Sequence, residues 1–293
     1  MSSSSVYEWR NSSVADTALR LEHILARSGA AARLHAAQNT FHSVQPFPHV
    51  VLDGLFPESL LDLADAEFPD PETPMGTPSA CKNAAKRRGR QWHCTAHGTG
   101  NGGHLKLGTG EEASMGRTLQ ALMRTFKSKS FVRHLEVLTG IGPLIVDDTN
   151  LGAGLHQIFS NGSLQIHADF NRHPDNHPQF GVIERRVNLF LYLNDKWRPS
   201  WGGHLQLWDR SLKACGQRIA PKRNRLVVFA STDYSFHGHA EPLACPPHRS
   251  RRSIAIYYYT SGKRPEGEVN VTARLRTPRG TLYRQPAGRC SEL

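Results

Sequence analysis

Hydrophobic positions in the first half of the chain recur at helical spacing. Apolar side chains between residues 17 and 37 approximate a period of 3.6, which predicts a helix. A short strand at 49–52 and a turn at Asp53-Gly54 precede a second helix from about residue 57. Residues 112–139 return to helical spacing, and Gly140 is positioned to end that helix. These helices need another layer on which to bury their apolar faces.

The pattern changes after residue 143 to short runs rich in β-branched and aromatic residues, separated by turn residues. The runs are LIVDD, LHQIFS, SLQIHAD, RVNLFLYLN, HLQLW, RLVVFAS and SIAIYYYT. Evenly spaced short strands without helical crossovers indicate an antiparallel sandwich or a jelly roll. We therefore expect a mainly β fold with flanking helices (α+β), in which N-terminal helices pack on a β core at 143–260.

Residues 70–111 are rich in Pro, Gly, Lys and His and show no sustained period. They predict a long surface loop, and loops of that length are often lids or binding segments. The expected organisation is a tail and helix at 1–40, one domain at 41–262 that contains this loop, and a basic tail at 263–293.

The 293-residue chain carries 36 Lys and Arg against 25 Asp and Glu, a formal charge of +11. Such an excess can attract anionic partners, but much of it falls in local runs near residues 82–90 and 274–289. No nucleic-acid-binding motif accompanies these runs, so we expect no nucleic-acid role. The sequence shows neither a signal peptide nor a membrane-spanning stretch, which predicts a soluble, cytoplasmic protein.

The five cysteines are odd in number, scattered and without CxxC spacing. This arrangement argues against a disulfide scaffold and against a cysteine zinc site. Reduced thiols are the expectation.

Candidate chemistry begins at His167-Ala168-Asp169, at the end of a predicted strand. Residues two apart in a strand point to the same face, so His167 and Asp169 can reach one metal ion. The HxD spacing alone is a weak signal in a chain with 16 histidines. Two histidines and one carboxylate, without a thiolate, would leave half of an octahedral Fe(II) open for chemistry.

A third ligand must come from another strand, and His237 lies 68 residues after Asp169 (237 minus 169). His239 shares its strand face by parity, so position does not decide between the two histidines. The strand at 251–260 places Arg251 with Ser253 on one face and Arg252 with isoleucines on the other. A guanidinium can grip a carboxylate in bidentate fashion, so Arg251 is the expected anion anchor and Arg252 the fallback.

The strand RVNLFLYLN also divides by parity. Val187, Leu189, Leu191 and Leu193 would pack against a covering layer, whereas Asn188, Phe190 and Tyr192 can line a cavity. Tyr192 could donate a hydrogen bond to a bound anion there, or it could simply be a core tyrosine.

Together these motifs resemble the 2-oxoglutarate and Fe(II)-dependent dioxygenases, in particular their prolyl 4-hydroxylase-like branch. The resemblance covers about residues 151–260. It is carried by HADFN, RRVNLFLYLNDKW, the glycine pair in WGGHLQLW, NRLVVFASTDYSFHGH and RRSIAIYYYT. It implies a double-stranded β-helix (jelly-roll) core.

The resemblance also assigns roles to residues. His167, Asp169 and His237 match the three iron ligands, since His237-Gly238 fits the family's distal histidine motif and His239 then lies behind it. Arg251 and Tyr192 match residues that bind 2-oxoglutarate, and Asn188 and Ser253 are expected beside them. Gln157 stands where some relatives have another co-substrate tyrosine. One departure is the interval of 14 residues from His237 to Arg251 (251 minus 237), which implies an inserted loop.

The implied activity is hydroxylation of an unactivated C–H bond with O2, releasing succinate and CO2. Fe(II) and 2-oxoglutarate are the implied cofactors, and ascorbate is a further one that the resemblance allows. The expected substrate is a prolyl residue of a peptide or protein; a free amino acid or natural-product small molecule is the alternative. A non-catalytic iron or 2-oxoglutarate sensor, a silent cupin-type jelly roll and a zinc module would also account for parts of the pattern. The sequence does not indicate an oligomeric state.

Overall fold

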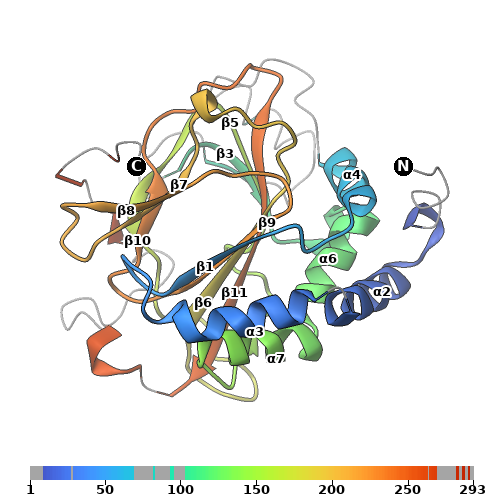
Figure 1. The fold of residues 1–293 in the computed structure, drawn as a ribbon, viewed down its shortest axis with the longest axis horizontal. Coiled ribbons are helices and arrows are strands. Elements are labelled where there is room, and N and C mark those ends of the chain that lie inside the picture. Colours follow the sequence, from blue (N-terminus) through green and yellow to red (C-terminus); the bar gives the residue numbers. More distant parts are fainter. Residues whose placement is uncertain are drawn as a thin grey trace.

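The computed structural model describes residues 9–27, 29–68, 82, 93–95, 103–262, 264–268, 282–283, 286–287 and 290. Twelve strands within these ranges form one sheet, and every strand pairing in it is antiparallel. The sheet curls on itself, and the helices gather on one side of it (Figure 1). The expected mainly β fold with a jelly-roll core and packed N-terminal helices is confirmed.

The main path through the sheet runs in the order β1-β9-β6-β11-β5-β10-β7-β8. Its strands are β1 (His49–Asp53), β5 (Gly154–Ala168), β6 (Ile183–Tyr192), β7 (Leu205–Trp208), β8 (Cys215–Ile219), β9 (Arg225–Ala230), β10 (Phe236–His239) and β11 (Ser250–Ser261). Off this path, β3 (Gly103–Thr109) and β12 (Leu282–Tyr283) pair with β5, β2 (His93–Thr95) pairs with β3, and β4 (Ile145–Val146) pairs with β11.

The helices cover the outward face of β6, β9 and β11. They are α2 (Val14–Arg27), α3 (Ala30–Phe41), α4 (Glu58–Glu67), α6 (Arg117–Lys127) and α7 (Lys129–Thr139). The described residues also form three short 3-10 turns: η1 (Glu112–Ser114) before α6, η2 (Pro199–Trp201) before β7, and η3 (Glu266–Glu268) after β11. Leu21, Leu122 and Leu135 from the helices share a buried core with Leu189 and Leu191 of β6. The parity that assigned the leucines of β6 to a covering layer is therefore confirmed.

Two of the expected helices are divided in the structure. The helix at 17–37 is two helices, because Gly29 adopts φ 75° in the left-handed region and breaks the helical path. The helix at 112–139 is likewise divided into η1, α6 and α7. Ser128 takes an extended conformation between α6 and α7, and its hydroxyl accepts a hydrogen bond from the amide of Phe131 as an N-cap.

The prediction of a loop at 70–111 was wrong for the end of that segment. There β3 pairs with β5 and contributes two fully buried leucines, Leu105 and Leu107. A strand this short, between glycines, carries too little periodic pattern to be recognised. Residues 93–95 are also a strand, and the rest of 70–102, apart from residue 82, lies outside the described residues.

The expectation of reduced thiols was also wrong. Cys215 of β8 forms a disulfide with Cys290, their Cα atoms 5.1 Å apart, and Cys94 is disulfide-bonded as well. The pairing joins cysteines 75 residues apart in the sequence, so spacing alone could not reveal it. Within the described part of the chain, no helix is long and apolar enough to cross a bilayer.

Candidate metal and co-substrate site

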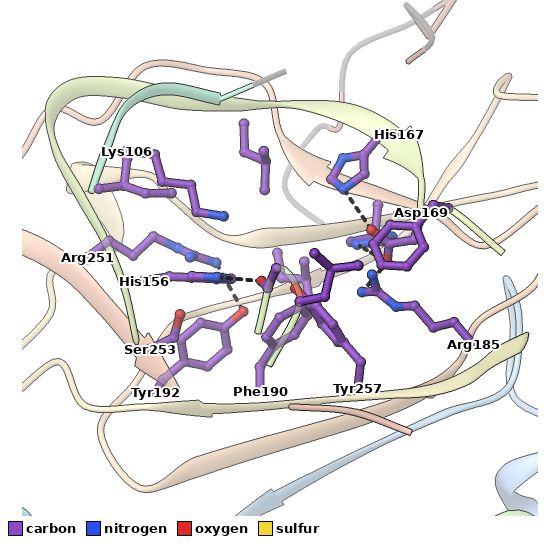
Figure 2. Close-up of a pocket in the computed structure, with 17 residues that line it drawn as sticks. Lys106, His156, His167, Asp169, Arg185, Phe190, Tyr192, Arg251, Ser253 and Tyr257 are labelled. Carbon is purple, nitrogen blue, oxygen red and sulfur yellow. Dashed lines mark hydrogen bonds and ion pairs between the residues drawn. The ribbon is translucent and has the colours of Figure 1, made fainter. Parts of the chain in front are cut away.

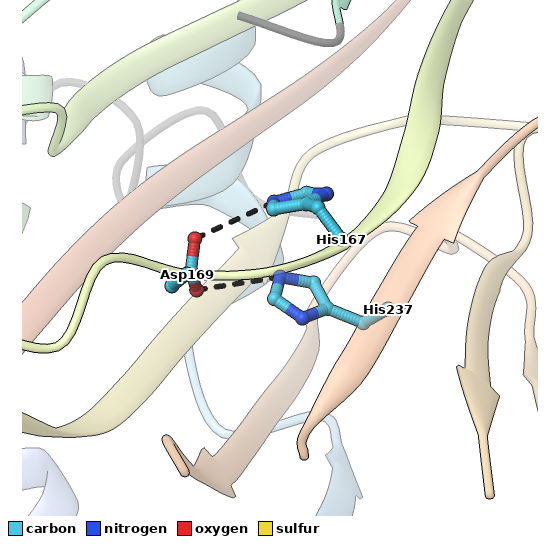
Figure 3. Close-up of side chains that lie close together, drawn as sticks. All are labelled: His167, Asp169 and His237. Atoms are coloured by element: carbon cyan, nitrogen blue, oxygen red, sulfur yellow. Dashed lines mark ion pairs between the residues drawn. The ribbon is translucent and has the colours of Figure 1, made fainter. Parts of the chain in front are cut away.

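Two adjacent strands bring the candidate metal ligands together. His237 of β10 lies opposite His167 of β5, and Asp169 follows β5 directly. Gly238 permits this approach, because a Cβ there would lie 2.6 Å from the carbonyl oxygen of Gln165. The side chains of the triad converge on one point (Figure 3).

The geometry of the triad suits a single metal ion. One ligand atom from each of His167, Asp169 and His237 lies within 4.8 Å of the others, and all three residues are buried. The Nε2 atoms of His167 and His237 are 3.4 and 3.5 Å from the two carboxylate oxygens of Asp169. Two imidazole nitrogens and one carboxylate oxygen form the donor set of Fe(II) sites with open coordination positions.

Backbone carbonyls orient both imidazoles. Nδ1 of His167 donates to the carbonyl of Gln165 at 2.8 Å, and Nδ1 of His237 donates to that of Ser235 at 2.9 Å. A carbonyl can only accept, so the proton sits on Nδ1 and Nε2 keeps its lone pair for a metal. Burial lowers the pKa of His237 to about 4, although Asp169 acts in the opposite direction. His237 is therefore neutral at physiological pH and can serve as a metal ligand.

A network behind Asp169 holds its carboxylate in place. Oδ2 of Asp169 accepts hydrogen bonds from Arg185 at 2.8 Å and from Asn188 at 2.7 Å, and Arg185 also donates to Asn188. Burial alone would raise the pKa of Asp169, but Arg185 and the two histidines hold it well below its usual range. The Arg185 guanidinium lies 3.2 Å from the ring centroid of Tyr257. Partners of this kind fix ligand geometry at metal sites.

The triad opens into a cavity of about 270 Å³ (Figure 2). Arg251 lines it at a distance from the triad, with Tyr192 and Ser253 beside it. Nη2 of Arg251 donates to the Tyr192 hydroxyl at 3.0 Å, and its Nε donates to the carbonyl of Gly203 at 2.8 Å. Burial raises the pKa of Tyr192, with Arg251 opposing it, so the phenol stays protonated and can donate. A cation and a hydroxyl thus face the cavity across from the triad.

Not every expected residue reaches this cavity. Gln157 is fully buried, does not line the cavity and donates to the Ser250 hydroxyl at 2.9 Å, because it faces the other side of β5 from His156 and Ile158. Asn188 donates to Asp169 and is not among the residues that line the cavity. Arg252 points the opposite way from Arg251 and pairs with Asp65 at 2.8 Å.

The structure also separates the two candidate histidines of β10. His239 is buried but is not part of the group whose ligand atoms meet at one point, whereas His237 is. Only His237 of the pair lines the cavity.

Three charged or imidazole-bearing residues of the cavity were missed by sequence reasoning. Lys106 of β3 and His156 of β5 line the cavity, and Arg185 both lines it and binds Asp169. Lys106 falls in the segment read as a loop. The Arg185-Arg186 pair near the start of β6 was the only available signal for Arg185. Parity would have favoured Arg186, because the register of β6 with β11 shifts between Arg185 and Val187.

Comparison with known families supports this geometry. The sequence model of the 2OG-Fe(II) oxygenase superfamily matches residues 153–259, the segment that contains the triad and Arg251. This segment belongs to the 2OG-Fe(II) oxygenase superfamily. Fe(II) and 2-oxoglutarate give this superfamily its name, and the donor set of the triad fits that metal. A comparison with curated proteins gave no match.

Solved structures similar to this chain include three prolyl hydroxylases. The Phytophthora capsici prolyl 4-hydroxylase shares 18% identity over 78% of this chain and 64% of its own, just under two thirds, with a TM-score of 0.45. A Pseudomonas putida prolyl-4-hydroxylase shares 17% over 78% and 100%, with a TM-score of 0.46. A Trichoplax adhaerens prolyl hydroxylase, solved with a hypoxia inducible factor peptide, shares 15% over 82% and 91%, with a TM-score of 0.47. Sequence identities and TM-scores this low give no information about the substrate of this chain.

Proposed function

We propose that the oxygenase hydroxylates an unactivated C–H bond of a prolyl residue in a peptide or protein. The observation that carries the hydroxylase assignment is the convergence of His167, Asp169 and His237 at the end of a cavity that Arg251 lines. The prolyl substrate rests on the sequence motifs shared with prolyl 4-hydroxylases. Hydroxylation of a free amino acid or another small molecule is the alternative.

Each residue has a distinct part in this proposal. His167, Asp169 and His237 hold Fe(II), which, when bound, supplies O2 activation coupled to the oxidative decarboxylation of 2-oxoglutarate to succinate and CO2. Arg251 binds the far carboxylate of 2-oxoglutarate in bidentate fashion, and Tyr192 and Ser253 donate hydrogen bonds to it. Arg185 and Asn188 keep Asp169 ionised and fixed toward the metal. The apolar walls Ile158 and Leu205 exclude water from the cavity.

The test is succinate release from 2-oxoglutarate under O2 with Fe(II) and ascorbate, with and without proline-containing peptides. The wild-type protein should release succinate, and peptides that are substrates should accelerate the release and gain one oxygen atom by mass. His167→Ala should abolish turnover because it removes a metal ligand. His239→Asn is the matched control, since it alters a buried histidine on the same strand as His237 that lies outside the triad, and it should retain turnover.

Three results would contradict the proposal. Full turnover by His167→Ala would refute the triad. Tight binding of 2-oxoglutarate without turnover on any peptide or amino acid would favour a sensor. Oxygen incorporation into free amino acids but into no peptide would favour the small-molecule alternative.

A further inference from the structure

Arg264 lies just beyond β11, in the segment expected to be a basic tail, yet it is buried, with 8% of its surface exposed. Nη1 of Arg264 donates to the carbonyl of Ser231 at 3.1 Å, and Nη2 donates to the carbonyls of Asn171, also at 3.1 Å, and Arg185. Nε lies 2.9 Å from a carboxylate oxygen of Glu184, which supplies the opposite charge that a buried cation needs. One guanidinium therefore joins three segments that are far apart in the sequence.

Two of these segments hold Asp169. Asn171 lies two residues after Asp169, and its carbonyl also accepts a hydrogen bond from the amide of Arg185 at 3.0 Å. The side chain of Arg185 donates to Oδ2 of Asp169 at 2.8 Å (Figure 2). Arg264 thus binds both the chain that carries the carboxylate ligand and the residue that orients this carboxylate.

The third segment leads to His237. Ser231 follows β9 and begins the turn to β10, and the carbonyl of Ser235 in this turn accepts the hydrogen bond that orients the His237 imidazole, at 2.9 Å. Asp233, in the same turn, accepts a hydrogen bond from the side chain of Asn171 at 3.0 Å. The turn is therefore bonded to the chain that follows the carboxylate ligand as well as to the guanidinium.

Sheet pairing alone does not fix the position of Asp169. The pairing of β5 with β10 places His167 opposite His237, whereas Asp169 lies one residue beyond the end of β5. On the side of β6 away from β11, the pairing with β9 ends and the chain after Asp169 takes its place, with Arg172 opposite Glu184. Two segments that follow each other along one side of a strand share no ladder hydrogen bonds, and a guanidinium with its five donors can bridge them.

We propose that Arg264 is a positioning residue of the metal site, which joins these segments and so keeps the Asp169 carboxylate in place beside the two imidazoles. This inference rests on the proposed function, in which the triad holds Fe(II). Arg264 is not among the described residues that line the cavity, so it acts through Arg185 and the main chain. Partners behind the ligands of a metal typically contribute about 10–100-fold to its affinity.

Metal binding by an Arg264 variant tests the inference without reference to turnover. Arg264→Met removes every donor but keeps a long side chain. The metal-free full chain is titrated with Co(II), which accepts the same nitrogen and oxygen donors and whose visible absorption bands report coordination geometry. The affinity for Co(II) should fall about tenfold or more, and the bands should change in position or intensity because the carboxylate is less firmly held.

Two further variants separate positioning from a general loss of stability. Arg223→Met removes another bridging guanidinium, which donates to the carbonyl of Glu58 and to the carboxylates of Glu58 and Asp62 away from the triad. As the matched control it should leave Co(II) affinity and the bands unchanged, even if urea denaturation shows a lower free energy of unfolding. Arg264→Lys keeps a cation near Glu184 but donates from one nitrogen, so it should weaken Co(II) binding by about threefold or more, the effect of losing one hydrogen bond.

The outcomes separate this inference from the proposed function. Wild-type affinity and bands in Arg264→Met overturn the positioning role, and Arg264→Lys decides in the same way if circular dichroism shows that Arg264→Met does not fold. An equal loss of affinity in Arg223→Met also overturns it, because any loss of stability would then weaken the site. Failure of the wild-type protein to bind Co(II), or full binding by His167→Ala, refutes the proposed metal site itself and this inference with it.

Discussion

Main-chain atoms do much of the positioning at the level of single residues. Both metal-facing imidazoles are held by a carbonyl two residues earlier in the chain, so neither needs a side-chain partner to fix its tautomer. The carbonyl of Gly203 holds Arg251 in the same way. A strand therefore supplies the ligand and its orientation together, which is why strand parity could place His167 and Asp169 side by side. The choice of His237 over His239 came from the family resemblance.

Strand parity could not predict that Lys106 and Arg185 line the cavity. Parity within one strand predicts which neighbours share a face, and it correctly placed Arg251, Ser253 and Tyr192 around one cavity. It cannot predict which separate strands become adjacent. Lys106 reaches the cavity only because β3 pairs with β5, and Arg185 reaches Asp169 because the chain that follows β5 pairs with the start of β6, through Arg172 and Glu184.

Gly203 offers a test of how tightly Arg251 is positioned. Its φ is +70°, and a Cβ there would lie 2.6 Å from Leu243 Cδ2 and 3.1 Å from Cδ of Arg251. Gly203→Ala should therefore displace the guanidinium and weaken 2-oxoglutarate binding by about tenfold, the effect of impairing one charge-assisted hydrogen bond. Anaerobic titration of the Fe(II)-loaded protein with 2-oxoglutarate measures this.

Gly202→Ala is the matched control for that experiment. Gly202 has nearly the same φ, +71°, but its added Cβ would meet only the carbonyl oxygen of Pro242, at 3.9 Å. Both variants carry the strain of a non-glycine residue at positive φ, on the order of 1–3 kcal/mol. Equal 2-oxoglutarate affinities in the two variants would show that crowding at Gly203 does not reach Arg251.

The sequence pattern predicted some strands of the sheet and missed others. Long strands with a strong apolar face, such as β6 and β11, were recognised. The edge strand β8 was not, because its residues are only partly buried and its sequence, CGQRI, does not alternate. The runs LHQIFS and SLQIHAD are one continuous strand, β5, because Asn161, with φ 64°, and Gly162 interrupt the pattern without ending the strand.

The helical layer should account for much of the stability of the sheet. Leu122 of α6 is fully buried in the core shared by the helices and β6. Leu122→Ala should lower the free energy of unfolding by about 2–5 kcal/mol, because it removes buried methyl groups and leaves a cavity. Urea denaturation followed by circular dichroism measures the change.

The same substitution on a neighbouring helix provides the control. Leu19 of α2 is 55% exposed, so Leu19→Ala should change the unfolding free energy by no more than about 0.5 kcal/mol. A loss at Leu122 as small as that at Leu19 would mean that α6 contributes little to the core.

At the scale of the whole molecule, the C-terminal chain returns to the metal site. Tyr283 of β12 pairs with His167 of β5, and Cys290 packs in a buried cluster with Ile166, Ala168 and Phe236. Ile166 and Ala168 lie on either side of His167 in the sequence, and Phe236 comes directly before His237. Residues near the C-terminus, expected only as a basic tail, thus contact the strands that carry the triad.

The disulfide between Cys215 and Cys290 should hold this arrangement together. Cross-linking residues 75 apart constrains the unfolded chain, so Cys290→Ser should lower the free energy of unfolding by about 2–4 kcal/mol. Cys245→Ser is the matched control: Cys245 is a buried free thiol, and its substitution removes no cross-link. Urea denaturation without reductant, and again with it, should show a larger reductant-sensitive loss in the wild-type protein than in Cys290→Ser, which keeps the disulfide of Cys94.

Peptide mapping of protein isolated without reductant tests the cross-link itself. Fragments containing Cys215 and Cys290 should be joined by mass, and both cysteines should resist alkylation until a reductant is added. Disulfides persist in oxidising compartments and are rare in the cytosol. Linked fragments from the native host would therefore argue against the cytoplasmic location expected from the sequence. Free alkylation of both cysteines would instead show that packing of Cys290 against Ile166 and Ala168 holds the C-terminal chain without a covalent bond.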